Sequence, residues 1–401
     1  MSTSPSSEGA QLTDGPREPT PPFTAEHEQF RRSTRKWVTE HLAPHADEWE
    51  ATKRFPDEVF RLCGGAGFFG LKFEEDWGGQ GRDVVADAVV VEELQWCRSG
   101  GVAAGIGTQM AIALPPIHRF GTDDQRERFL RPGIRGERIG SLAISEPEAG
   151  SDVAGLRTRA RRVEDGWLVS GSKMYITNGV RADFLVTAVR TSPSDGGARH
   201  SGISLLVIEP GRTTGFSASA LDKMGCGASD TALIALDDVF VPDENLLGEE
   251  GRGFRMIMSG FVWERIHMSL VALGNMSSWF GRTCDFVRNR EAFGRPLGRN
   301  QVVAHELAEI ATTIHTCRTI TYDALRRYAE GADCRQEAAM AKLVTQRAAC
   351  EALDRMLQLH GGAGYMSEYG IERTYRDSRL GPIGGGSDQI MREIIAKDLA
   401  L

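Results

Sequence analysis

Residues 157–179 read RTRARRVEDGWLVSGSKMYITNG, and this stretch decides the fold. Polar and apolar side chains alternate on both sides of Asp165–Gly166, a frequent turn pair between antiparallel strands. Three later segments, ADFLVTAVRT, GISLLVIEP and TALIALDDVFVP, keep the period of two and are rich in aliphatic and β-branched residues. We therefore predict a β domain over residues 141–248.

Helical spacing replaces this alternation on either side of the β domain. Residues 24–140 carry apolar side chains at helical intervals with charges opposite them. Farther on, apolar residues recur at spacings of three and four, namely Val303, Leu307, Ile310, Ile314 and Cys317. The chain is thus predicted to be α+β, with a helical domain (24–140), the β domain and a helical bundle (249–401). Clustering of the strands excludes a doubly wound α/β sheet.

Composition narrows the class of protein. The 401 residues carry a net charge of −8, which argues against a nucleic-acid partner. Seven cysteines without a CxxC pair are typical of reduced thiols, so we expect a cytoplasmic location and no disulfide framework. His41 and His45 have no third ligand nearby, and no metal site is expected.

Two segments were tested for a signal peptide or a membrane span. Residues 1–23 are rich in Pro, Ser and Thr without an apolar run, so we expect a disordered tail and no signal peptide. The uncharged run Ser99–Ile117 is nearly long enough to span a membrane. Its glycines and two prolines lower its hydrophobicity, so we expect a buried helix and no membrane span.

Glu264 is the strongest candidate for a reacting group. Apolar residues lie seven and three positions before it and four and seven after it, namely Ile257, Phe261, Met268 and Val271. These offsets share one helical face. A carboxylate among apolar side chains is costly unless paired or protonated, and burial raises its pKa toward that of a useful general base. A buried ion pair with an arginine of another helix is an equal alternative.

Two loops have the composition of ligand-binding segments. GPIGGGSDQIMREIIAK (381–397) places three glycines before Ser387, a predicted helix N-cap, and exposed N–H groups there bind anions or carbonyl oxygens. RNREAFGRPLGRNQ (288–301) surrounds Phe293 with arginines, which suits a nucleotide diphosphate and its base. The alternatives are a flexible loop between helices for the first segment and a solvated connection between helices for the second.

Taken in order, five segments make the chain resemble the acyl-CoA dehydrogenase family. They are AISEPEAGSD (143–152), GSKMYITNG (171–179), REAFGRPLGRNQ (290–301), QLHGGAGYM (358–366) and the glycine-rich loop near the C-terminus. The resemblance covers the chain from Phe23 to Leu401. It implies a middle β domain between an N-terminal helical domain and a C-terminal four-helix bundle, usually in a homotetramer.

The resemblance also implies FAD as cofactor and assigns its contacts. Ser145 and Ser151 are similar to residues that contact the flavin ring or the acyl-CoA, and Tyr175 and Thr177 to residues that pack on the isoalloxazine. Arg290, Phe293 and Gln301 are similar to residues that hold the FAD pyrophosphate and adenine, often across a subunit interface. The remaining FAD contacts are implied for Gln358, Gly362, Ser387 and Gln389. Substrate contacts are implied for Ser151, Arg265 and Gly385.

Two positions hold the catalytic base in this family, and one of them has a carboxylate here. The position used by medium- and short-chain enzymes corresponds to Gly385. The position used by long-chain and isovaleryl enzymes corresponds to Glu264, followed by Arg265. The resemblance thus implies that Glu264 removes the α-proton of an acyl-CoA while a hydride moves to flavin N5. The Gly385 N–H would polarise the thioester carbonyl, and an electron-transfer flavoprotein is the implied acceptor.

Substrate identity is less constrained. The resemblance places Gly100, Gly101, Gly105 and Gly107 in the segment that floors the acyl pocket of relatives, so we expect a deep pocket there. Together with the position of the base, this favours a long-chain or branched acyl group. One departure from the family is Gly227, which stands where an arginine is frequent. Alternatives are oxidation of an acyl group on a carrier protein, an acyl-CoA oxidase, or a catalytically silent thioester-binding scaffold.

Overall fold

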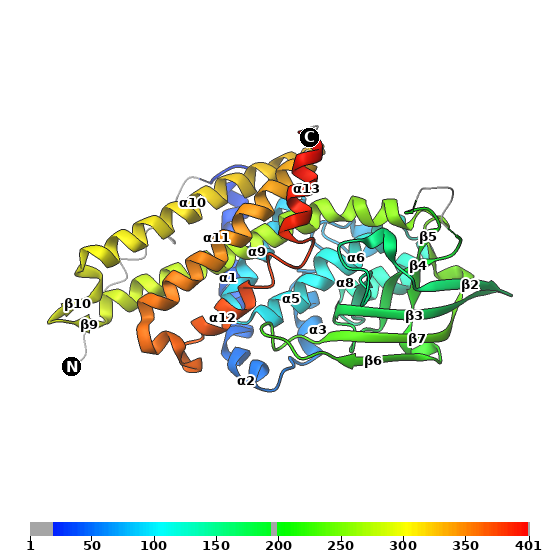
Figure 1. Ribbon diagram of the computed structural model, residues 1–401, viewed down its shortest axis with the longest axis horizontal. Coiled ribbons are helices and arrows are strands. Elements are labelled where there is room, and N and C mark those ends of the chain that lie inside the picture. The colour runs from blue at the N-terminus through cyan, green and yellow to red at the C-terminus, as the bar shows by residue number, and fades with distance from the viewer. Residues whose placement is uncertain (1–18, 194–198, 400–401) are drawn as a thin grey trace.

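The computed structural model describes residues 19–193 and 199–399, which form an elongated molecule with the sheet at one end and long helices reaching the other (Figure 1). Helices precede and follow the strands along the chain, so the predicted α+β architecture is confirmed. Of the predicted disordered tail, residues 1–18 lie outside the described residues. The prediction was wrong at the end of that span, because Phe23 is buried with its ring centroid 4.7 Å from that of Tyr322.

Short helices make up the N-terminal part. They are α1 (Ala25–His41), α2 (Ala46–Ala51), α3 (Glu58–Gly65), α4 (Val84–Leu94), α5 (Gly100–Thr108), α6 (Leu114–Phe120), α7 (Asp123–Gln125) and α8 (Arg131–Ile134). Helix α1 begins at Ala25 because Thr24 caps it: the hydroxyl of Thr24 accepts a hydrogen bond from the N–H of His27.

The central α4 and α5 are buried on nearly all sides, which explains their lack of a polar face. The segment Gly100–Phe120, which includes α5 and α6, is long and apolar enough to cross a membrane. However, 72% of its most apolar window is buried inside the fold, as in the core helix of a folded domain.

Eight strands form one sheet in the order β6-β7-β3-β2-β4-β5-β8, with β1 paired to β4. They are β1 (Gly140–Ala143), β2 (Arg159–Val163), β3 (Gly166–Thr177), β4 (Phe184–Arg190), β5 (Ile203–Ile208), β6 (Phe216–Ala220), β7 (Thr231–Pro242) and β8 (Leu246–Leu247). The predicted hairpin is present between β2 and β3. Its two-residue connection is Glu164–Asp165, because Gly166 already pairs with Val163.

The period of two sends alternate side chains of β4 into different cores. Phe184, Val186 and Ala188 join the large core shared with the helices. Leu185 and Val189 join a second core inside the sheet domain. The sheet is therefore buried on both faces here, and one face is fixed against the helices.

Long helices form the C-terminal bundle. They are α9 (Gly253–Asn289), α10 (Gln301–Ala329) and α11 (Arg335–His360), with the shorter α12 (Ile371–Ser378) and α13 (Asp388–Asp398) beside them. A two-stranded ribbon of β9 (Glu291–Ala292) and β10 (Arg295–Pro296) joins α9 to α10 at the end of the molecule opposite the sheet (Figure 1). At 1.5 Å per residue, the 37 residues of α9 extend for about 55 Å.

Candidate functional site

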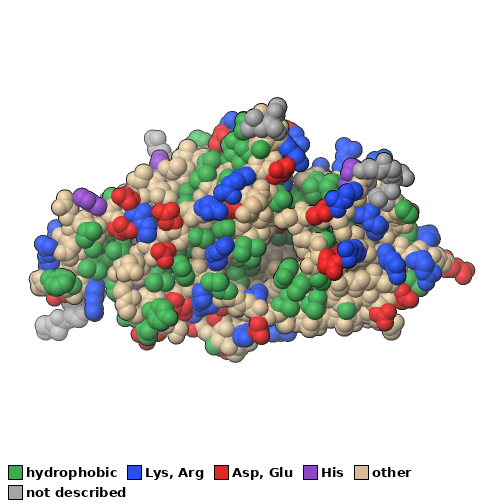
Figure 2. Space-filling view, in the orientation of Figure 1, with side chains coloured by type: hydrophobic (Ala, Val, Ile, Leu, Met, Phe, Trp, Pro, Cys, Tyr) green, Lys and Arg blue, Asp and Glu red, His purple; other side chains and the backbone are tan. Residues whose placement is uncertain are grey.

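The apolar face around Glu264 is partly open. Phe261, Met268 and Val271 are only partly buried, as is Glu264 itself, whereas the neighbouring Ile266 and Leu270 are fully buried. Figure 2 shows a hollow near the middle of the molecule, in the region where Figure 1 draws the loop between α12 and α13. The carboxylate thus lies on an apolar surface that a ligand could cover.

Gly385 lies beside this carboxylate. A Cβ built on Gly385 would be 3.3 Å from Oε1 of Glu264 and 3.3 Å from Cγ of Met268. Its φ of +57° is in the left-handed region, which favours glycine. The N–H of Gly385 has no hydrogen-bond acceptor among the described residues. Gly385, whose N–H is unpaired in the described chain, and the carboxylate of Glu264 therefore approach each other from the C-terminal loop and α9.

Burial sets the electrostatics of Glu264. Desolvation raises the pKa of its carboxyl group, and the positive charges of Arg265 and Lys342 oppose that rise. Arg265 is itself 8% exposed, burial lowers its pKa, and its Nε has no hydrogen-bond partner within the described residues. No ion pair of Glu264 is found in that part of the chain, so the alternative of a buried salt bridge is not realised there. A carboxyl group with a raised pKa and no partner suits proton transfer.

Lys342, on α11, was not predicted. Its side chain is fully buried, and Nζ donates hydrogen bonds to the carbonyl oxygens of Gly381 (3.0 Å) and Gly386 (2.6 Å). Both carbonyls belong to the loop that carries Gly385. The sequence signal was a lysine in the otherwise apolar run AAMAKLV (338–344), which indicates a buried ammonium group with a specific task.

The predicted flavin-side residues surround the end of β3. The N–H of Met174 donates to the carbonyl oxygen of Ser145 (2.9 Å), which places the 144–152 loop against the strand. Tyr175 has a φ of +65° and its side chain is 64% exposed. The hydroxyl groups of Ser145, Ser151 and Thr177 make no hydrogen bond with other described residues, so they are available to a ligand.

A second buried pair, also not predicted, supports this loop. Lys173 is fully buried and donates to Oε1 of Glu146 (2.8 Å) and to the carbonyl oxygen of Ile144 (3.0 Å). Glu146 also accepts from the N–H groups of Arg157 (2.6 Å) and Thr158 (2.9 Å). Burial lowers the pKa of Lys173 to about 8, whereas this lysine and these hydrogen bonds keep the pKa of Glu146 low.

Apart from the flavin-side residues at β3, the predicted site residues fall into two groups. The central cluster contains Glu264, Arg265, Gly385 and the helix start at Ser387 and Gln389, together with Lys342, which was not predicted. Its N-cap prediction is confirmed, because Ser387 Oγ accepts from the N–H of Ile390. The distal cluster consists of Arg290, Phe293, Gln301, Gln358 and Gly362. The His360–Phe286 ring stacking at 4.3 Å joins the end of α11 to the far part of α9 within this distal cluster.

One chain does not bring the two clusters together. Glu264 and Asn289 both belong to α9, and their 25-residue separation corresponds to about 38 Å along the helix. Phe293 follows this end and is 97% exposed, and no partner of the Arg290 side chain is found in the described chain. The distal cluster is thus an exposed aromatic and cationic surface remote from Glu264 of the same chain.

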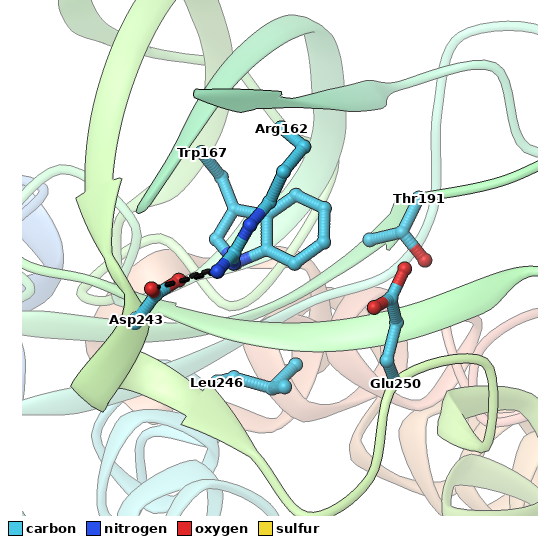
Figure 3. A pocket seen from close by; sticks show the side chains of 6 residues that line it. All are labelled: Arg162, Trp167, Thr191, Asp243, Leu246 and Glu250. Carbon is cyan, nitrogen blue, oxygen red and sulfur yellow. Dashed lines mark hydrogen bonds and ion pairs between the residues drawn. The ribbon is translucent and has the colours of Figure 1, made fainter. Parts of the chain in front are cut away.

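Other candidate sites can be set aside. A surface pocket of about 550 Å³ lies on the sheet domain, where Arg162 pairs with Asp243 beside Trp167 (Figure 3). None of the predicted site residues lines it. Within the described residues, no group of three or more His, Cys, Asp or Glu side chains could hold a metal ion.

The glycines of α5 do not open a pocket. A Cβ on Gly101 would be 2.7 Å from the backbone N of Ala228, and a Cβ on Gly105 would be 2.6 Å from the ring of Phe55. At Gly107 the neighbour is the ring of His267, 3.1 Å away. The prediction of a deep acyl space from these glycines was wrong, because protein atoms fill the space and the glycines permit close packing.

His267 gives this packing a measurable pH dependence. Burial lowers its pKa to about 4, aided by the charge of Lys72, so the folded protein holds it neutral. The unfolded chain binds a proton near pH 6.5, so stability falls as pH drops below that value. Between pH 7 and 4.5, the free energy of unfolding of His267→Gln is expected to fall by about 2 kcal/mol less than that of the wild type. Urea unfolding at each pH measures the difference. Parallel pH dependences for the two proteins would contradict this assignment.

Gly227 lies at a junction between domains. A Cβ there would be 2.6 Å from Oε2 of Glu50. The adjacent Cys226 donates its N–H to Asp377 of α12 (2.5 Å), which also accepts from the N–H of Gly100 (3.1 Å). Burial raises the pKa of Asp377 to about 6, and the charge of Glu50 contributes to the rise. An arginine at position 227 would begin beside the carboxylate of Glu50.

Sequence comparison places similar domains in the same order. Models of the acyl-CoA dehydrogenase N-terminal, middle and C-terminal domains match residues 24–137, 141–239 and 251–400. The chain is 36% identical to mouse long-chain specific acyl-CoA dehydrogenase over 94% of its length and 87% of the relative. It is 34% identical to Arabidopsis thaliana isovaleryl-CoA dehydrogenase over 92% of this chain and 90% of the relative.

Comparison of structures agrees with this result. The crystal structure of an acyl-CoA dehydrogenase from Geobacillus kaustophilus superposes with a TM-score of 0.91. The two chains are 37% identical, and the superposition covers 96% of this chain and 100% of the other.

Proposed function

Because the chain belongs to the acyl-CoA dehydrogenase family, we propose that Glu264 is the base with which it removes the α-proton of an acyl-CoA thioester. The single observation that carries this proposal is the convergence of Glu264 and Gly385 on one partly open apolar surface. Enzymes of this family oxidise the CH–CH bond next to a thioester. Removal of the α-proton needs a base beside a donor for the carbonyl oxygen, and these two residues supply both.

Gly385 would act on the thioester carbonyl. Its N–H, which has no acceptor in the described chain, would donate to the oxygen as negative charge develops there. Arg265 would add positive charge beside Glu264 and so favour the ionised form of the base. Apolar side chains around them would exclude water from the acyl group.

The residues present fit FAD as the cofactor. The open ring of Tyr175 and the unpaired hydroxyl groups near it suit a flavin, and the exposed Phe293 and Arg290 suit an adenine and a diphosphate. When bound, FAD accepts the hydride equivalent from the β-carbon. This chain would hold the cofactor through polar and aromatic side chains without a metal.

Distance supports an oligomer. Tyr175 belongs to the sheet domain, and Phe293 lies beyond the far end of α9. We propose that the distal cluster of one subunit completes the cofactor site of another, as in a homotetramer. An electron-transfer flavoprotein is the proposed acceptor, and a cytoplasmic location stays a prediction.

Removing the distal contacts is expected to weaken FAD binding. Phe293→Ala removes a stacking partner and Arg290→Ala removes a phosphate ligand, so each is expected to lower FAD affinity about tenfold. Flavin titration of the apoprotein measures the change, with Phe240→Ala as a control for loss of an exposed aromatic ring. An unchanged affinity in both variants would place the adenine end of the cofactor elsewhere.

Substrate length is best settled by experiment. We propose a long-chain or branched acyl-CoA, which is supported by the position of Glu264 and by the long-chain and isovaleryl names of the relatives. The test is an anaerobic titration of the flavoprotein with acyl-CoAs of graded length and branching, followed by bleaching of the visible flavin band. Bleaching by one class identifies the substrate. A bound flavin that no acyl-CoA bleaches would contradict the proposal.

A further inference from the structure

Lys342 is a buried cation whose task is not explained by packing. Its side chain is fully buried on α11, and burial lowers its pKa to about 8. A buried ammonium group is retained only where specific acceptors compensate its desolvation. Here the acceptors are the carbonyl oxygens of Gly381 (3.0 Å) and Gly386 (2.6 Å).

These two carbonyls bracket the Gly385 backbone. The loop between them contains several glycines, and glycine-rich backbone has high conformational entropy. Two hydrogen bonds from one ammonium group restrict both ends of the loop, and the N-cap at Ser387 then fixes the start of α13. The position of the Gly385 N–H therefore depends on Lys342.

The side chain of Lys342 also lies near Glu264, and its positive charge opposes the rise in the pKa of that carboxyl group. A Cβ on Gly385 would be 3.6 Å from Cε of Lys342 and 3.3 Å from Oε1 of Glu264. Cε of Lys342 and Oε1 of Glu264 are thus no more than about 7 Å apart. An ammonium group has three N–H donors, and the third has no acceptor in the described chain. Other charges near Lys342 are Arg265 on α9 and Asp388 on α13, which pairs with Arg347.

We propose that Lys342 is a positioning residue that couples the two halves of the reaction site. One ammonium group holds the loop that presents the Gly385 N–H and supplies positive charge to the carboxylate of Glu264. This inference rests on the proposed role of Glu264 as the base. It adds that one side chain on α11, Lys342, fixes the position of the Gly385 N–H and adjusts the charge state of Glu264.

Two variants separate the hydrogen bonds from the charge. Lys342→Met removes both, whereas Lys342→Gln keeps an amide donor without the charge. Lys397→Met, which removes an exposed lysine from α13, is the matched control. The first measurement is the rate of anaerobic flavin reduction by saturating acyl-CoA from pH 5.5 to 9.

Loss of the charge is expected to move the acid limb of this profile. Without the neighbouring cation the carboxyl group of Glu264 holds its proton to higher pH, so the limb shifts up by about one pH unit in both variants. Lys342→Met is also expected to lower the limiting rate at least about tenfold, because the Gly385 donor is no longer held. A purely structural lysine would lower the rate without moving the limb. An unmoved limb in folded, flavin-containing Lys342→Gln would overturn the inference.

A readout without substrate keeps the two proposals distinguishable. Amide hydrogen exchange of residues 381–387 is expected to become at least tenfold faster in Lys342→Met and to stay unchanged in Lys397→Met. Faster exchange with no flavin reduction even in the wild type would contradict the proposed function and leave the loop contacts supported. Unchanged exchange in an active Lys342→Met protein would contradict the inference alone.

Discussion

Glu264→Gln is expected to retain its flavin and to slow flavin reduction by acyl-CoA about 10³-fold. The amide has nearly the shape of the carboxylate, so packing on α9 is preserved, but it cannot accept the α-proton. Among the described residues, Oε1 of Glu264 is the carboxylate oxygen found next to Gly385.

Stopped-flow reduction under anaerobic conditions measures this effect. Asp285→Asn is the control, since it removes an exposed carboxylate from the same helix. The wild-type rate should fall as pH drops through the raised pKa of Glu264, and Glu264→Gln should lose this dependence. A variant that is reduced within tenfold of the wild-type rate would show that another group takes the proton.

Lys173→Met is expected to destabilise the protein by about 3–5 kcal/mol, the usual cost of leaving a buried charge without its partner. Glu146 would keep the N–H donors of Arg157 and Thr158 but lose its counterion. Because Lys173 also holds the carbonyl oxygen of Ile144, the loop that carries Ser145 and Ser151 would loosen. Flavin affinity is expected to fall with stability.

Urea unfolding of the holoprotein checks the prediction. Arg161→Met is the control, because it removes an exposed charge from the neighbouring strand β2. The double variant Lys173→Met/Glu146→Gln should recover part of the loss, since it no longer buries an unpaired carboxylate. A loss below about 1 kcal/mol in Lys173→Met would mean that water already compensates Glu146.

The period of the apolar residues predicted the helices and strands that bury one face. The alternation around Asp165 identified β2 and β3, and the apolar positions of α10 identified a bundle helix. Short strands such as β8, with two residues, carry no such period and were missed. The apolar stripe around Glu264 was found in the sequence, but it does not face the core alone, because Phe261, Met268 and Val271 are only partly buried.

Distances in the site could not be predicted from a pattern along the chain. The resemblance assigns Phe293 and Tyr175 to one cofactor, yet Tyr175 belongs to strand β3 of the sheet and Phe293 lies beyond the far end of α9. The proximity of Glu264 and Gly385 joins positions 121 residues apart and depends on how α9 meets the C-terminal loop. The glycines of α5 misled for the same reason, since the sequence does not show what fills the space beside a missing side chain.

One carboxylate has a consequence for recombination among relatives. Asp377 comes from the C-terminal helices, yet it accepts hydrogen bonds from Gly100 in the helical part and from Cys226 in the sheet domain. A chimaera that takes its last 150 residues from another family member would import that member's version of this three-way joint. A Cβ on Gly100 would be 2.6 Å and a Cβ on Gly225 2.7 Å from an oxygen of the Asp377 carboxylate, so an exchange of these segments is expected to need positions 100, 225 and 377 from one parent.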